Sequence, residues 1–182
     1  MPMPQKNFYT EEDYYALPED VRAELIDGQL IYNQASPSRL HQTILSELHA
    51  TIHQYIKSKK GSCHIYPAPF AVQLREDRKT IVEPDISVIC DSSKLTDKGC
   101  TGAPDWIIEI VSPGNPGHDY IRKLQLYADT GVREYWIVDL EKQIITVYDF
   151  ENETVNNYIF SDKVNVGIYE DFEIDFSQIS VE

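Results

Sequence analysis

The stretch IVEPDISVI occupies residues 81–89, and the stretch WIIEIV occupies residues 106–111. Both are rich in β-branched apolar residues, which is typical of buried strands, yet Asp85 lies inside the first and Glu109 inside the second. Burying an ionised carboxylate costs several kcal/mol unless a partner neutralises it. If the two strands are neighbours in one sheet, the carboxylates lie side by side and repel each other unless a proton or a cation lies between them.

Two explanations fit these carboxylates. Taken singly, Asp85 and Glu109 are each explained as a loop cap or as the partner of an arginine. Taken together, they are oxygen ligands of the kind that a hard cation such as Mg²⁺ or Mn²⁺ prefers. The pair therefore favours a metal site with both residues as ligands.

Helices and further strands are expected on both sides of these stretches. Apolar residues recur every four positions from Ile44 to Ile56 and predict a helix that begins at Pro37, with Ser36 as its cap, and ends near Lys57. The other predicted elements are a short helix after residue 10, a hairpin of 22–26 and 29–33, a bent strand at 64–74, a helix at 119–130, and strands at 134–140 and 144–150.

From residue 37 onward the predicted order is helix, three strands, helix and strand. This order indicates an α/β (α+β) protein with a mixed sheet flanked by helices, an N-terminal hairpin and extra C-terminal strands. At 182 residues the chain is expected to form a single domain, 1–182, with a core at about 37–140 and an acidic, β-rich extension at about 141–182.

The acidic residues are concentrated at the two ends of the chain. The formal net charge is -14: residues 1–27 hold seven acids and two bases (-5), and residues 139–182 hold eleven acids and two bases (-9). The stretch 28–138 is therefore neutral, with twelve of each. The charge predicts weak electrostatic affinity for nucleic acid, but it does not exclude such a partner at the centre of the chain.

Hydropathy and cysteine usage bear on the cellular compartment. No apolar run approaches the roughly 20 residues of a membrane span, and residues 1–7 lack the apolar stretch of a signal peptide. The three cysteines, Cys63, Cys90 and Cys100, are odd in number and lack CxxC spacing, which is typical of a reducing environment. We therefore expect a cytoplasmic protein with no membrane partner.

The two strand motifs together resemble a known nuclease signature. Pro84-Asp85 followed by Glu109-Ile110-Val111 is similar to the bipartite motif of the PD-(D/E)xK nuclease superfamily, whose restriction-endonuclease-like fold has an αβββαβ core. A wider set of stretches, within residues 8–150, resembles the Uma-type family of restriction-endonuclease-like proteins. These stretches are Glu24-Leu25-Ile26-Asp27-Gly28, Ser36-Pro37 with His41, Val82-Glu83-Pro84-Asp85, Glu109-Ile110-Val111-Ser112-Pro113, Asp119 with Lys123 and Tyr127, and Gly131 through Tyr135-Trp136-Ile137-Val138-Asp139.

The resemblance implies a metal-dependent endonuclease-like hydrolase. Asp85, Glu109 and the carbonyl of Ile110 would hold Mg²⁺ or Mn²⁺, and a metal-activated water would hydrolyse phosphodiester bonds in DNA. The superfamily motif places a lysine two residues after the glutamate, where this sequence has Val111. The family resemblance assigns that role to Lys123 on the following helix, because a long side chain there can reach the same space.

Two further residues are candidates by the same resemblance. Glu24 is similar to the additional acid that many such enzymes place near the metal, as a ligand or a holder of water. His41 lies near the start of the long helix, where a helix cap or a surface histidine is the alternative to a catalytic role. Tyr127, one turn beyond Lys123, is expected to serve packing.

Several alternatives remain open from the sequence. Asp119 and Lys123 are spaced i,i+4, which either orients the ammonium or makes a surface pair. The turn at 112–118 either faces a substrate or only connects two elements. Because Val111 replaces the motif lysine and the flanks are acidic, the chain could instead be an inactive interaction or nucleic-acid-binding module on a nuclease-derived fold. A homodimer is a further option, since nucleases that cut both strands are often dimers.

Overall fold

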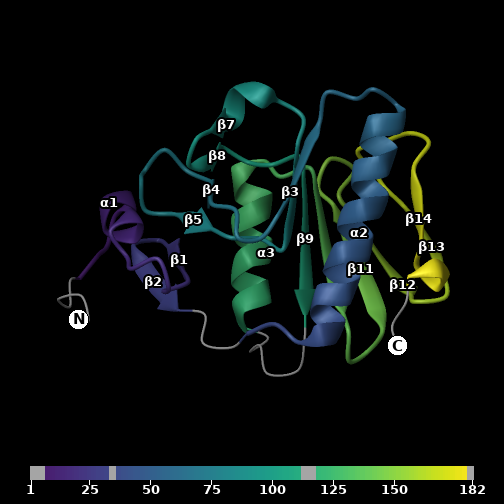
Figure 1. Cartoon of the computed structure of the whole chain (residues 1–182), viewed down its shortest axis with the longest axis horizontal. Helices are drawn as coiled ribbons and strands as arrows, with labels where there is room; N and C mark the ends of the chain where they lie inside the picture. The colour runs from purple at the N-terminus through teal and green to yellow at the C-terminus, as the bar shows by residue number, and fades with distance from the viewer. Residues whose placement is uncertain (1–6, 33–35, 112–117, 180–182) are drawn as a thin grey trace.

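The computed structural model contains two six-stranded sheets, a two-stranded sheet and two long helices in its described part (Figure 1). The structure describes residues 7–32, 36–111 and 118–179. The two long helices are α2 (Arg39–Ser58) and α3 (His118–Thr130), and a short helix, α1 (Glu11–Tyr15), precedes the first strand. Single 3₁₀ turns occur at Ser92–Lys94 and Phe176–Gln178.

The central sheet carries the two apolar stretches with which the sequence argument began. Its strand order is β12 (Thr154–Ile159), β11 (Ile144–Asp149), β10 (Glu134–Asp139), β9 (Trp106–Val111), β6 (Ile86–Ile89) and β3 (His64–Pro67). Strands β9 and β10 are parallel and the other neighbours are antiparallel, so the sheet is mixed. The order α2, β3, β6, β9, α3, β10 confirms the predicted αβββαβ core.

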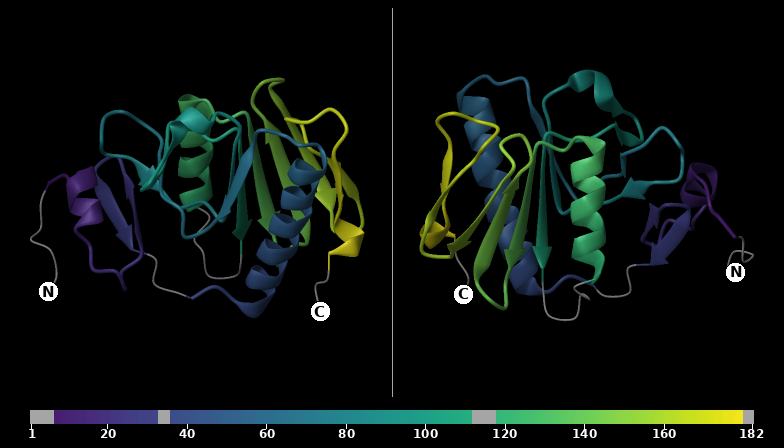
Figure 2. Two further views of the ribbon diagram at one scale, coloured as in Figure 1. Left: turned by 45° about the horizontal axis from the view of Figure 1, so that its top comes forward. Right: turned by 180° about the vertical axis from the view of Figure 1, so that it is seen from behind.

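The two long helices cover opposite faces of the central sheet (Figure 2). One apolar cluster joins α2 and the C-terminal segment to one face, and a second cluster joins α3 to the other face. The second cluster also contains residues of the second sheet, such as Val72 and Val82. The face covered by α3 is therefore the one on which the central sheet, the helix and the second sheet meet.

The second sheet is built from short strands of the N-terminal half. Its order is β2 (Gln29–Tyr32), β1 (Ala23–Ile26), β5 (Ile81–Val82), β4 (Val72–Gln73), β8 (Gly99–Thr101) and β7 (Leu95–Thr96). The β1–β2 hairpin confirms the turn prediction, since Asp27 and Gly28 both adopt positive φ, at 50° and 78°. Strands β7 and β8 were not predicted.

The stretch 81–89 is not one strand, which corrects the sequence prediction. It forms β5 in the second sheet and β6 in the central sheet, with Pro84-Asp85 between them. Proline has no N–H to donate to a strand ladder, so the chain leaves one sheet at this point and enters the other. Asp85 consequently precedes β6 instead of lying inside a strand.

Helix α2 begins two residues later than predicted. Its cap is Ser38, whose hydroxyl accepts a hydrogen bond from the backbone N–H of His41 at 3.1 Å. Ser38, and not the predicted Ser36, is therefore the cap, although both are serines that can fill this role. Pro37 lies before the helix and is not its first residue. This later start places His41 in the first turn.

The C-terminal extension adds one edge strand to the central sheet and then forms a two-stranded sheet of its own, which packs on the same apolar cluster as α2. Strand β12 extends that sheet, as predicted, whereas β13 (Lys163–Asn165) and β14 (Glu173–Asp175) pair with each other. Buried Glu134 fastens the segment, since its two oxygens accept from Trp136 Nε1 at 2.6 Å and from the N–H of Ile168 at 3.0 Å. Burial raises the pKa of Glu134, and these donors oppose the rise.

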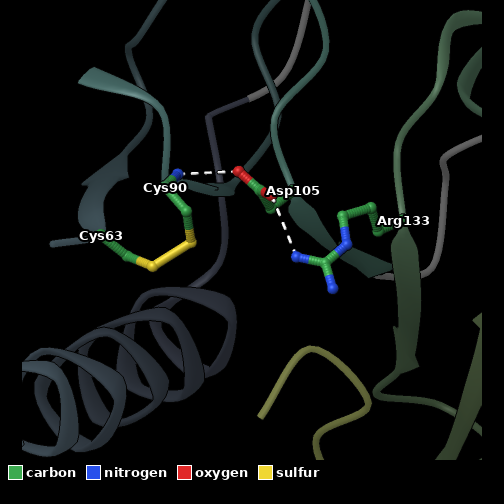
Figure 3. The surroundings of a disulfide bond; sticks show 4 residues. All are labelled: Cys63, Cys90, Asp105 and Arg133. Carbon is green, nitrogen blue, oxygen red and sulfur yellow. Dashed lines mark hydrogen bonds and ion pairs between the residues drawn. A yellow bond between two sulfur atoms is a disulfide. The ribbon is translucent and has the colours of Figure 1, made fainter. Parts of the chain in front are cut away.

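Cys63 and Cys90 form a disulfide at one end of the β3–β6 pair (Figure 3). In this register His64 pairs with Ile89, so the two cysteines, one position further out, lie opposite each other. The disulfide departs from the reducing environment that the count and spacing of the cysteines predicted. That prediction could not include the pairing of β3 with β6, which brings the two cysteines together. A cytoplasmic location stays a prediction.

None of the described helices combines the length and the apolar character that a membrane crossing requires.

Candidate active site

Asp85 and Glu109 face each other across the β6–β9 pair. Ile86 pairs with Ile108 in this antiparallel ladder, so the preceding residue, Asp85, lies opposite Glu109. Asp85 Oδ2 accepts a hydrogen bond from the backbone N–H of Ile110 at 2.7 Å, which fixes the carboxylate against β9. Three residues predicted as site members therefore lie together at the end of two neighbouring strands.

His41 holds the second oxygen of Asp85. Its Nε2 lies 3.2 Å from Asp85 Oδ1, and the imidazole is almost fully buried. The other ring nitrogen, Nδ1, is buried without a hydrogen-bond partner among the described residues. His41 thus reaches the site from the first turn of α2, across the sheet edge, and orients the aspartate.

Lys123 reaches the site from α3 on the other side. Its Nζ donates to Glu109 Oε1 at 3.1 Å and to Glu24 Oε1 at 2.9 Å, and all three side chains are buried. The ammonium therefore lies between a carboxylate of the central sheet and a carboxylate of the second sheet. A lysine two residues after Glu109, as in the superfamily motif, would stand at the position of Val111. In this chain the ammonium beside Glu109 comes from Lys123 instead.

Glu24 and Glu83 connect the site to the N-terminal elements. Glu24 Oε1 also accepts from the backbone N–H of Glu83 at 2.9 Å. The side chain of Glu83 turns away and accepts from the Tyr14 hydroxyl at 2.7 Å and from Arg22 at 3.0 Å. Although Glu83 belongs to the Glu83-Pro84-Asp85 motif, it ties α1 and β1 to the site strand and is not part of the carboxylate cluster.

Tyr127 contributes more to the site than packing. Its hydroxyl donates to Glu109 Oε1 at 2.9 Å, so this oxygen accepts from both Tyr127 and Lys123. The sequence signal was present, since the two residues are i,i+4 neighbours on α3 and thus point the same way. Neither Glu109 Oε2 nor Glu24 Oε2 receives a hydrogen bond among the described residues.

The site holds more negative than positive charge. Burial raises the pKa of Glu109 to about 7, the Lys123 ammonium opposes that rise, and the carboxylates of Asp85 and Glu24 add to it. Burial also raises the pKa of Tyr127 well above its usual value, so its hydroxyl stays protonated and donates to Glu109. Three carboxylates facing one ammonium form an environment that favours binding of an additional cation.

The donor set fits a magnesium-like ion better than a cation that needs a protein cage. No group of three or more His, Cys, Asp or Glu side chains is arranged to hold a metal within the described ranges. Mg²⁺, however, usually binds through one or two carboxylates and keeps several waters. Asp85 and Glu109 are two carboxylates opposite each other, and Glu109 Oε2 has no hydrogen bond among the described residues, so they suit an ion of this kind.

Two sequence expectations cannot be compared with the structure. The side chain of Asp119, the expected i,i+4 partner of Lys123, lies outside the described residues, and so does the turn at 112–117.

Comparison with known proteins agrees with this architecture. The sequence profile of the Uma2 family, described as "Putative restriction endonuclease", matches residues 11–181. The uncharacterised protein slr1290 of Synechocystis is 26% identical over 147 residues, which cover 79% of this chain and 75% of that protein.

A solved structure shares the fold. The crystal structure of a putative nuclease belonging to DUF820, from Anabaena variabilis, superposes with a TM-score of 0.76 at 21% identity, covering 93% of this chain and 96% of the other. Because the family profile spans nearly the whole chain, including all the site residues, this chain belongs to the Uma2 family of restriction-endonuclease-like proteins.

Proposed function

We propose that the protein is a metal-dependent nuclease that hydrolyses phosphodiester bonds in DNA. One observation carries the proposal: the Lys123 ammonium lies 3.1 Å from Glu109 Oε1, and Glu109 lies opposite Asp85. An acid pair with a nearby ammonium is the set of groups that the nuclease motif requires, although the lysine comes from a helix and not from the strand.

In this proposal Asp85, Glu109 and the carbonyl of Ile110 hold Mg²⁺ or Mn²⁺. A bound divalent cation supplies Lewis-acid polarisation of the phosphate and lowers the pKa of a coordinated water. The raised pKa of Glu109 supports this assignment, since a cation between the carboxylates would offset the repulsion that contributes to it.

The side chains around the carboxylates have distinct roles. As an ammonium, Lys123 would position the attacking water and offset the negative charge that develops on the phosphate. Glu24 holds the Lys123 ammonium toward the site, at 2.9 Å. His41 and Tyr127 orient Asp85 and Glu109 respectively, so both carboxylates are fixed before a substrate arrives.

DNA is the proposed substrate, with weak electrostatic affinity. The central part of the chain is neutral while both flanks are acidic, so few phosphate contacts are expected and binding should weaken quickly with salt. A tight, nonspecific nuclease is therefore not expected, and the choice of cleavage site must come from shape or from a localising partner.

The test is cleavage of supercoiled plasmid DNA in Mg²⁺ or Mn²⁺. Asp85→Asn and Glu109→Gln should each abolish nicking and Lys123→Met should lower it by about 100-fold or more, while Asp129→Asn on the exposed part of α3 should nick like the wild type. Circular dichroism and thermal melting establish that each variant is folded. Absence of cleavage by the folded wild type on DNA and RNA, with either cation, overturns the proposal.

A binding measurement separates the alternative of an inactive module. Because a ligand that binds only the folded state raises its thermal stability, Mn²⁺ should raise the melting temperature of the wild type and not that of Asp85→Asn. An equal shift in both proteins, or none in either, favours an interaction module on a nuclease-derived fold.

A further inference from the structure

Strand β12 is a long and unprotected edge of the central sheet. Among the described strands it pairs only with β11, on one side, and most of its residues are exposed. Natural edge strands are usually short, charged, bulged or interrupted by proline, because free backbone groups recruit other strands. The sequence Thr-Val-Asn-Asn-Tyr-Ile at 154–159 has six residues, no charge and no proline.

The register shows which backbone groups of β12 face outward. The N–H of Phe150 bonds to β10, at the carbonyl of Arg133, so alternate residues of β11 point toward β10 and the others toward β12. Val147, which points toward β12, pairs with Asn156. Asn156 therefore faces β11, and its neighbours Val155 and Asn157 present their N–H and C=O groups away from the sheet.

At one end of the strand the outward-facing backbone groups already have hydrogen-bond partners. Ile159 also points outward, but its N–H donates to Asp162 Oδ2 at 2.9 Å and its C=O accepts from the N–H of Asp162. No hydrogen bond to the backbone of Val155 or Asn157 from outside β12 occurs among the described residues. Each chain thus offers two N–H and two C=O groups, on residues spaced two apart.

We propose that two copies of this chain pair through β12, antiparallel, about a two-fold axis at Asn156. In that register Val155 of each copy faces Asn157 of the other, and the four N–H and four C=O groups of both copies form four hydrogen bonds. The arrangement is isologous, so it closes on itself and does not continue into a filament. It joins the two central sheets into one of twelve strands.

The side chains are compatible with this register. Asn156 lies opposite its own copy, and Thr154 lies opposite Tyr158, so no like charges lie opposite each other between the two copies of β12, although each chain carries a net charge of -14. Val155, which is 56% exposed, lies opposite Asn157 and diagonally beside Val155 of the other copy, so its side chain gains an apolar neighbour at the seam. Nucleic-acid phosphate is not a favoured occupant of this edge, because the strand has no lysine or arginine.

The pairing should be reversible. A single six-residue edge covers less than the roughly 800 Å² per partner of a standard interface, so the dimer should dissociate on dilution. The edge is also remote from the candidate site. Glu109, Ile137, Thr146 and Asn157 are successive partners across four strands, which places three strand spacings between the glutamate and the edge.

Charges introduced at Asn156, on the two-fold axis, test both the edge and its register. In light scattering coupled to size exclusion, the molar mass of the wild type should rise with concentration from 21.0 kDa toward twice that value. Asn156→Lys and Asn156→Asp place like charges directly opposite each other, so each alone should remain monomeric. Mixing the two variants should restore a dimer that contains one copy of each.

A matched control and defined outcomes complete the test. Gln54→Lys and Gln54→Asp make the same changes on the exposed surface of α2 and should dimerise like the wild type. A wild type that stays monomeric at all concentrations overturns the proposal and leaves the edge to a strand of another protein. Dimers that persist in both Asn156 variants, or variants that fail to pair on mixing, also overturn it. The Mn²⁺ shift should be unchanged in all four variants.

Discussion

The ammonium of Lys123 lies within hydrogen-bonding distance of Glu109, at 3.1 Å from Oε1, although the two residues belong to a helix and to a strand. In the superfamily motif both groups would come from one strand, two residues apart. Here the strand position holds Val111, and the helix packed on the same face of the sheet supplies the ammonium. An ammonium therefore lies beside Glu109 although the strand itself carries no lysine at this position.

A lysine introduced on strand β9 should restore part of the activity that is lost when Lys123 on helix α3 is replaced. Lys123→Met should lower plasmid nicking by about 100-fold or more, since a positioned acid–base group is worth at least that much. Val111 is on the same face of β9 as Glu109, because side chains alternate along a strand. Val111→Lys added to Lys123→Met should therefore recover part of the activity.

The control for this exchange is Val111→Met added to Lys123→Met, which adds length without charge and should recover nothing. Equal nicking by the two double variants would contradict the idea that the ammonium is what the site needs.

Removing the Tyr127 hydroxyl should loosen Glu109 without abolishing the site. Tyr127→Phe deletes the donor to Glu109 Oε1 and should lower the free energy of unfolding by about 1–2 kcal/mol, as expected for a hydrogen bond to a buried carboxylate. Nicking should fall by less than about tenfold, because Lys123 still holds the same oxygen. Tyr148→Phe, which removes a hydroxyl with no hydrogen bond among the described residues, is the control for urea unfolding.

Glu109 should make stability depend on pH in the metal-free protein. Its pKa is raised from 4.5 to about 7 on folding, so the folded chain binds the proton more tightly than the unfolded chain does. The free energy of unfolding should therefore fall as pH rises between about 4.5 and 7. Glu109→Gln should flatten this part of the urea-unfolding profile in EDTA. A wild type and a variant with parallel profiles would rule out this contribution.

Breaking the disulfide should destabilise the fold and spare the site. Cys63 and Cys90 are 27 residues apart, and closing a loop of that size is worth about 3 kcal/mol. The Cys63→Ser/Cys90→Ser protein should unfold at correspondingly lower urea concentration yet keep the Mn²⁺ shift, since Asp85 lies at the other end of β6. The same melting temperature with and without reductant would show that the bond contributes nothing.

Local patterns in the sequence predicted most of the central sheet. The apolar run at 106–111 coincides with β9, and the Asp27-Gly28 turn coincides with a hairpin. The split of 81–89 was missed because β-branched residues on both sides of Pro84 look like one strand. Nothing between residues 91 and 101 was predicted, because β7 and β8 are two and three residues long and have no detectable period.

The candidate site was predicted in its members but not in its contacts. The resemblance to a nuclease family supplied Asp85, Glu109 and Lys123, and the structure brings them together. That Glu83 turns outward to Tyr14 and Arg22 depends on how α1 docks, which no local pattern contains. The role of the Tyr127 hydroxyl likewise depends on the packing of α3 against β9.

The passage of the chain from β5 to β6 at Pro84-Asp85 makes the site a product of two sheets. Glu24 comes from one sheet, Glu109 from the other, and Asp85 from the crossing between them. A partly folded chain that has assembled one sheet alone lacks part of this set of charged groups, so it lacks the candidate site. The groups proposed to cut DNA therefore come together only when both sheets have formed and packed on each other.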